Sequence, residues 1–191
     1  AWFAGETAAR ADSAISRNTI RARIIGTDML LQIALLAFLV LMLTTAIMDL
    51  TTMTIPNSLN LALLGLFLLF AVLMQVSPAQ VVAALGIGIL GLVVAGGLYA
   101  VGVMGGGDVK FIACVLPWFG FSQAAAAFAI WSVLYGGALC VALLMLRAIP
   151  MPAFIARQDW IMRLHQHGGG VPYGVAMAAA GMKMSAEVFA F

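Results

Sequence analysis

The chain has 191 residues, of which 64% are hydrophobic and only 8% are charged, and its mean hydropathy is +1.12. A soluble globular domain carries about 25% charged residues, so this composition excludes that class and indicates a membrane protein. The net charge of +2 is too small, and the basic residues too scattered, to indicate a nucleic-acid-binding surface. We therefore expect the lipid bilayer, and no nucleic acid, as a partner.

Residues 1–28 form a polar stretch with four arginines and three acidic residues. They show no clean apolar stripe at helical spacing, so we expect a mobile or surface-lying tail. The apolar run that follows is too long for a secretory signal, and no small-residue cleavage site closes it. The sequence thus predicts an N-terminal tail over residues 1–28 and a membrane domain over residues 29–191.

Six apolar stretches follow the tail, and a membrane helix needs roughly 20 such residues. Pro56 suits the first turn of the second helix, where the missing N–H of proline is not needed. Pro117 and Gly120 interrupt the fourth stretch, which should therefore form a short or broken helix. The fold class predicted is an all-α polytopic membrane protein of about six helices, over residues 29–48, 59–76, 80–104, 109–119, 122–146 and 171–191.

Two aspartates, Asp49 and Asp108, stand at the ends of apolar stretches. One pair of crossings separates them, so they should lie at the same membrane face, together with the polar loop over residues 147–170. Basic residues do not orient the chain by the positive-inside rule, because the tail and the aspartate face carry four each. An acid in or beside the bilayer is costly unless something compensates it, so both aspartates are functional candidates.

Two carboxyl groups held close in a pocket of low dielectric cannot both ionise, so such a pair shares one proton. This is the arrangement of an aspartic protease, in which one carboxylate takes a proton from water and the other donates to the scissile carbonyl. The glycines directly before Asp108 would let a substrate strand approach the backbone closely. Lys110 would either balance the charge of Asp108 or extend to the membrane interface.

Three sequence elements resemble the type IV prepilin peptidases, which are membrane aspartic proteases of the GxGD type. Gly105-Gly106-Gly107-Asp108 with Lys110 matches the Gly-x-Gly-Asp-x-Lys motif. Asp49, followed after five residues by Ile55-Pro56-Asn57, resembles the first aspartate motif of this family. Val171-Pro172-Tyr173-Gly174 resembles its Pro-aromatic-Gly element.

The resemblance implies that Asp49 and Asp108 are the catalytic pair, and the chemistry of two carboxyl groups needs no metal or cofactor. It also implies an endopeptidase that removes the short basic leader of a prepilin after a glycine, at the cytoplasmic face of the bacterial inner membrane. The supporting residues implied, for substrate binding or for shaping the site, are Gly105, Gly106, Gly107, Lys110, Pro56, Asn57, Pro172, Tyr173 and Gly174.

The chain departs from the larger members of that family, which carry Cys-x-x-Cys pairs and also methylate the new pilin terminus. It has two cysteines, Cys114 and Cys140, and no Cys-x-x-Cys. We therefore expect peptidase activity without methyltransferase activity, as in the short form that serves Flp-type (tight-adherence) pili. The link between Asp49 and Ile55 has no basic residue, although family members often have some there.

Two functions of other classes stay open. A small transporter could use Asp49 and Asp108 as a proton or cation relay, although the duplicated halves common among transporters are not evident. A membrane scaffold of a secretion machine would not depend on the acids at all.

Two further features have a structural and a functional interpretation. Lys183 and Glu187 could pair or form a proton path, and His165 with His167 could be solvated or bind metal.

Overall fold

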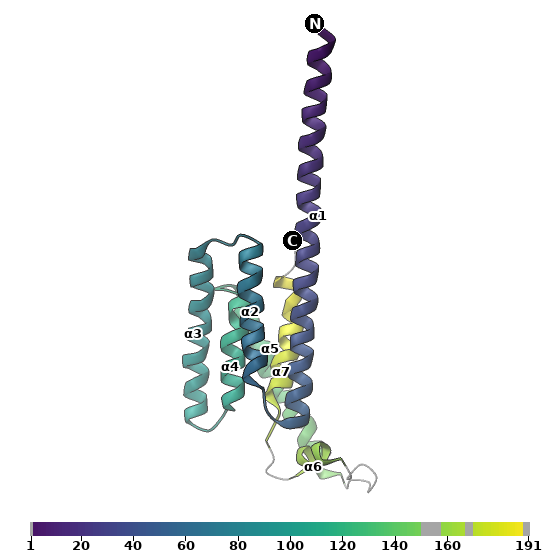
Figure 1. Cartoon of the computed structure of the whole chain (residues 1–191). Coiled ribbons are helices and arrows are strands. Elements are labelled where there is room, and N and C mark those ends of the chain that lie inside the picture. The colour runs from purple at the N-terminus through teal and green to yellow at the C-terminus, as the bar shows by residue number, and fades with distance from the viewer. Residues whose placement is uncertain (1, 150–157, 167–169, 189–191) are drawn as a thin grey trace.

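The computed structural model describes residues 2–149, 158–166 and 170–188, and every regular element among them is helical (Figure 1). Three of the described helices contain a stretch that is long and apolar enough to cross a membrane: Asp28–Thr52, Pro78–Ala100 and Gln123–Ala148. The helix Asn57–Leu73 is also apolar but shorter. The predicted fold class, an all-α polytopic membrane protein, is confirmed.

Helix α1 (Trp2–Thr52) contains both the predicted polar tail and the first predicted span. Its N-terminal part extends beyond the ends of the other helices (Figure 1). This differs from the expected mobile or surface-lying tail. An existing helix adds one hydrogen bond for each further residue without a new nucleation step, so the extension does not require an apolar stripe. The division into a tail and a membrane domain stays a prediction.

The next helices follow the predicted order with shifted ends. Helix α2 (Asn57–Leu73) begins directly after Pro56, and α3 (Pro78–Ala100) begins with a capping box between Ser77 and Gln80. The third span was predicted to reach residue 104, but α3 ends at Ala100, five residues before the first glycine of the run. The short fourth helix is confirmed: α4 (Gly106–Val115) passes into the 3₁₀ helix η1 (Leu116–Trp118), which contains Pro117.

Helix α5 (Gln123–Ala148) is followed by two further described helices. Within the stretch predicted as a polar loop, the structure places a short helix, α6 (Asp159–His165). Seven residues are too few for apolar periodicity to be recognised in the sequence. Helix α7 (Tyr173–Val188) packs along α1 and α5 and is the last described element.

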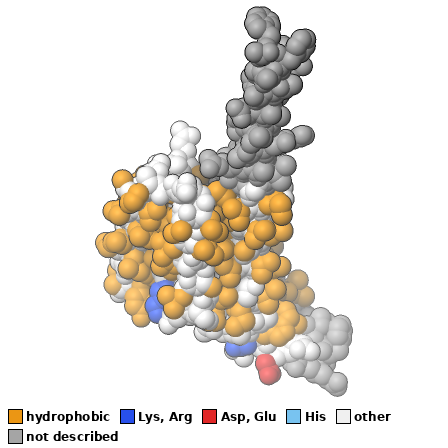
Figure 2. Space-filling view, turned by 45° about the horizontal axis from the view of Figure 1, so that its top comes forward, with side chains coloured by type: hydrophobic (Ala, Val, Ile, Leu, Met, Phe, Trp, Pro, Cys, Tyr) orange, Lys and Arg blue, Asp and Glu red, His pale blue; other side chains and the backbone are white. Residues whose placement is uncertain are grey.

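The core lies where α1, α2, α4, η1 and α7 meet, with further buried residues from α3 and α5, and aromatic side chains fill much of it. Trp118 of η1 contacts the rings of Phe38, Phe67 and Phe70, at centroid distances of 5.0, 5.8 and 5.7 Å. Outside this core, large apolar side chains cover the surface of the bundle (Figure 2). In each of the three candidate spans, no more than 28% of the apolar window is buried inside the protein. Most side chains of these spans are therefore available to contact lipid.

Candidate active site

Asp49 lies in the last turn of α1, where the helix ends and the chain reverses into α2. Its side chain is 5% exposed. Met53, directly after the helix, has a φ of 56°, the left-handed conformation common at helix ends, and its N–H donates to the Asp49 carbonyl at 2.9 Å. The backbone hydrogen bond and the left-handed residue together end α1 and turn the chain toward α2, directly after the turn that contains Asp49.

Asp108 is the third residue of α4 and is 8% exposed. Its carboxyl group interacts with the backbone N–H of Gly105, the residue that precedes the helix. A carboxylate at this position that reaches back to the cap residue satisfies one of the unpaired amides of the first turn. A Cβ on Gly105 would lie 3.1 Å from Asp108 Oδ2, so glycine gives the carboxyl room to fold back.

The two carboxyl groups line one cavity of about 730 Å³, and they are close enough to interact electrostatically. The prediction that both acids lie at the same end of the bundle is therefore confirmed by geometry. Their roles in catalysis stay a prediction. Predicted supporting residues that also line this cavity are Asn57, Gly105, Gly106, Gly107, Lys110 and Tyr173.

The N-terminus of α7 packs directly against Asp49. Pro172 is fully buried, and a Cβ on Gly174 would lie 2.8 Å from Asp49 Oδ2 and 2.9 Å from its Cγ. The backbone amides of Gly174 and Val175 interact with the same carboxyl group. Oδ2 itself is buried and makes no hydrogen bond of good geometry within the described part of the chain. The start of α7 and the end of α1 thus enclose the Asp49 carboxyl group between them.

The two aspartate motifs also contact each other. Lys110 Nζ donates to Asn57 Oδ1 at 3.0 Å, which joins the start of α4 to the start of α2. A Cβ on Gly107 would lie 3.4 Å from the backbone nitrogen and from the Cβ of Ile55, so this glycine allows the two segments to pack tightly. Pro56 does not line the cavity; its carbonyl accepts the N–H of Leu59 and so starts α2.

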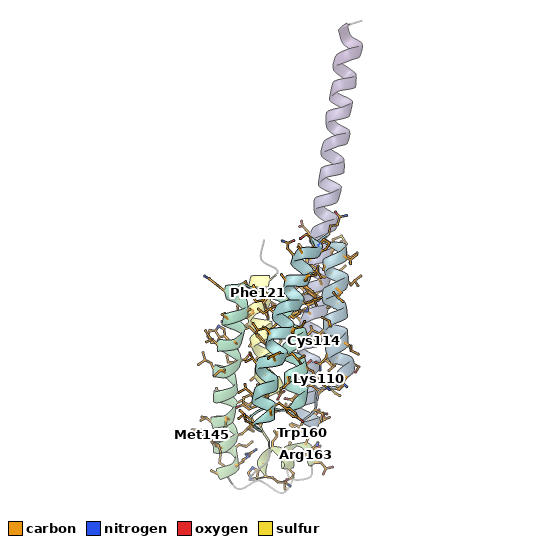
Figure 3. All side chains as sticks on the ribbon, turned by 90° about the vertical axis from the view of Figure 1, so that its left-hand side faces the viewer. Lys110, Cys114, Phe121, Met145, Trp160 and Arg163 are labelled. Carbon is orange, nitrogen blue, oxygen red and sulfur yellow. The ribbon has the colours of Figure 1, made fainter. Side chains whose placement is uncertain are left out.

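Sequence reasoning missed two kinds of residue that hold the site together. The sequence indicates Ile55 only as part of a motif, yet its side chain is 6% exposed and lies against both Gly107 and Gly174. Arg163 of α6 donates from Nη2 to the Thr51 carbonyl at 2.6 Å, and Arg147 donates from Nε to the Leu164 carbonyl at 2.8 Å. Figure 3 shows Arg163 and Trp160 at the same end of the bundle as Lys110. The sequence signal, arginines within a polar loop, does not indicate which carbonyls they bind.

Other candidate sites remain unassembled among the residues that the structure describes. No group of three or more His, Cys, Asp or Glu side chains there could hold a metal ion. His167 lies outside the described residues, and so does the side chain of Glu187. Lys183 Nζ lies 4.3 Å from the centroid of the Trp131 ring, a cation–π contact that neither interpretation of this lysine anticipated.

The comparisons with known proteins agree with the motifs. The family model described as "Type IV leader peptidase family" matches residues 36–146, which is more than half of the chain and includes both aspartates. No curated protein and no solved structure matches the chain. On the family match, this protein is a member of the type IV leader peptidase family.

Proposed function

We propose that this protein is an aspartic endopeptidase of the membrane that removes the short basic leader of a Flp-type prepilin after a glycine. Asp49 and Asp108 are its catalytic pair. The observation that carries the proposal is the burial of both carboxyl groups in one cavity beside a run of three glycines. Membership of the leader peptidase family supports a peptide bond as the target.

The chemistry needs one proton shared by the two carboxyl groups. The ionised carboxylate removes a proton from a water molecule, whose oxygen attacks the carbonyl carbon of the scissile bond. The protonated carboxyl group donates its proton to the carbonyl oxygen, which gives a tetrahedral intermediate. Its collapse breaks the C–N bond: the departing amine takes the proton held by the first carboxylate, and one hydroxyl of the intermediate returns a proton to the second carboxylate as the carbonyl re-forms. The aspartates then again share one proton.

The glycine run supplies what an unwound substrate needs. A transmembrane helix must lose its internal hydrogen bonds around the bond to be cut, and the freed amides and carbonyls need partners at once. Gly105, Gly106 and Gly107 line the cavity and have no side chains to keep a substrate strand away from their backbone. We place this end of the bundle at the cytoplasmic face of the bacterial inner membrane, as the family resemblance implies.

The test is the intact mass of a Flp-type prepilin after incubation with the purified protein in detergent. The variants are Asp49→Asn, Asp108→Asn and, as a matched control, Asp159→Asn, which changes an exposed acid of α6. We expect loss of the leader after its glycine with wild type and with the control, and no cleavage with the other two. We expect no added methyl group. Cleavage that survives either change of a buried aspartate would exclude the two-aspartate mechanism.

A further inference from the structure

A second, larger cavity opens between α3 and α5. Helix α3 packs on α4 and η1, whereas α5 packs on α7. The space left between α3 and α5 is a groove of about 800 Å³, which we call the α3–α5 groove. Apolar side chains form almost all of its lining, and its few polar members are Ser122, Gln123 and Ser132.

The α3–α5 groove has a buried floor and exposed rims. Small residues occur along the floor, among them Gly91, Ala95 at 3% exposure and Ala125 at 7%. The rims carry large apolar side chains such as Val94 and Val133, which are 60% and 72% exposed. Small residues between larger ones are what allow a second helix to approach closely inside a membrane, where packing rather than the hydrophobic effect drives association.

The α3–α5 groove adjoins the cavity that contains the two aspartates. Met104 and Tyr173 line both. Tyr173 is held at this junction by α5, because a Cβ on Gly136 would lie 2.7 Å from its Cε1 atom. From the junction the groove extends to Phe121, which Figure 3 shows near the end of the bundle opposite to Lys110. The apolar groove therefore extends along the bundle from the edge of the cavity with the two carboxyl groups.

We propose that the α3–α5 groove binds the hydrophobic helix of the substrate and so presents the bond before that helix to Asp49 and Asp108. This rests on the proposed function, in which a polar leader precedes a hydrophobic helix. The residues of α3 that line the groove run from Ile87 to Leu98. At 1.5 Å per residue that is about 16 Å, or three helical turns. A substrate helix in the groove would have its leader end at Met104 and Tyr173 and its other end toward Phe121.

The first experiment compares two substrates. One is an intact prepilin, and the other is a soluble peptide with the leader and the cut site but without the hydrophobic helix. Ala129→Trp fills the groove from the exposed surface of α5. Its matched control is Ala138→Trp, which changes an exposed alanine of the same helix outside the groove lining. Loss of the buried contact of one apolar side chain lowers binding about tenfold to a hundredfold, so Ala129→Trp should raise KM for the prepilin by this factor and leave peptide cleavage unchanged.

The second experiment does not depend on cleavage. A photoreactive benzoylphenylalanine replaces Ala129 or, as the control, Ala138, in the Asp108→Asn background, and the protein is irradiated with the prepilin in lipid vesicles. We expect an adduct with the hydrophobic helix of the prepilin from position 129 only. Adducts with lipid alone at position 129, or equal prepilin adducts at both positions, would overturn the proposal for the groove. If wild type cleaves the prepilin but position 129 gives no adduct with it, the groove is not the binding site, although the proposed function stands. If position 129 gives the adduct but wild type does not cleave the prepilin, the proposed function is wrong, although the groove does bind the helix.

Discussion

At the scale of single residues, Gly174 is the position where one added methyl group should disturb the site most. Its Cα faces the Asp49 carboxyl group so closely that a Cβ would lie 2.8 Å from Oδ2 and 2.8 Å from Ile55 Cδ1. Neither neighbour is free to move, because Asp49 and Ile55 are both buried. The close approach of α7 to the end of α1 therefore depends on glycine at this position.

We predict that Gly174→Ala lowers the rate of prepilin cleavage about a hundredfold, the usual result of moving a catalytic group by roughly 1 Å. The added methyl would displace the Asp49 carboxyl, while most of the bundle stays folded. Cleavage kinetics and the thermal unfolding temperature in detergent measure both effects. The control is Gly137→Ala in α5, where a Cβ meets nothing within 4 Å. A Gly174→Ala protein as active as the control would refute this assignment.

Lys110 and Asn57 form the polar contact between the two aspartate motifs. The lysine was expected either to balance the charge of Asp108 or to extend to the interface, and the structure shows its amine on Asn57 Oδ1 at 3.0 Å. Both side chains are exposed. Their contribution is therefore that of a hydrogen bond at a surface rather than that of a buried charge pair.

We predict a small coupling between Lys110→Met and Asn57→Ala, of about 0.5–1 kcal/mol, because an exposed hydrogen bond exchanges with water. Unfolding free energies of the wild type, the two single variants and the double variant, measured by SDS titration in mixed micelles, give the coupling directly. If the change in unfolding free energy of the double variant equals the sum of the two single changes, this contact does not stabilise the packing of α2 on α4.

At the scale of elements, the position of Asp108 depends on how α4 packs against α3. At Gly88 the two helices approach closely, because a Cβ there would lie 2.6 Å from the Ala113 carbonyl oxygen and 3.0 Å from Pro117 Cγ. A backbone carbonyl and a proline ring cannot turn aside as a flexible side chain can. The two helices can therefore be this close only because α3 has glycine there.

Gly88→Ala should destabilise the protein by about 1–3 kcal/mol, since overpacking forces α3 and α4 apart. The measurement is again the unfolding free energy in mixed micelles. Gly86→Ala, two residues away, is the matched control, because its Cβ would meet only Phe121 Cε2 at 3.8 Å. Alanine favours a helix over glycine by roughly 1 kcal/mol, so the control should be as stable as wild type or more so. Equal stability of the two variants would contradict the inferred packing.

Much of this element-scale arrangement could be predicted from the sequence. Pro117 indicated that the fourth helix is short or broken, because proline cannot continue the backbone hydrogen bonds. The positions of Arg147 and Arg163 could not be predicted. Each binds a backbone carbonyl of another segment, and every residue has such a carbonyl, so no side-chain pattern identifies the partner. The contact of Ile55 with Gly174 could not be predicted either, because an apolar side chain shows no preference in the sequence for one neighbour over another.

At the scale of the whole molecule, the helices alternate in direction, so that particular helix ends gather at each face. The end of α1 and the starts of α4 and α7 meet at the cavity with the two aspartates, and α6 lies at this end too (Figure 1). Counting the spans from the sequence was enough to predict that Asp49 and Asp108 share a face. The counting could not tell which face this is, because the basic residues are balanced between the two sides.

The membrane orientation gives the last prediction. In a chain with Cys114 and Cys140 changed to alanine, Asp159→Cys adds a thiol at the exposed start of α6, on the side of the aspartates. Ala79→Cys adds one at the exposed start of α3, at the opposite end of the bundle. If the active site faces the cytoplasm, a membrane-impermeant maleimide should label position 79 in intact spheroplasts and label position 159 only after lysis. The reverse pattern would place the aspartates outside the cytoplasm, where an unprocessed leader, with its positive charge on the cytoplasmic side, could not reach them.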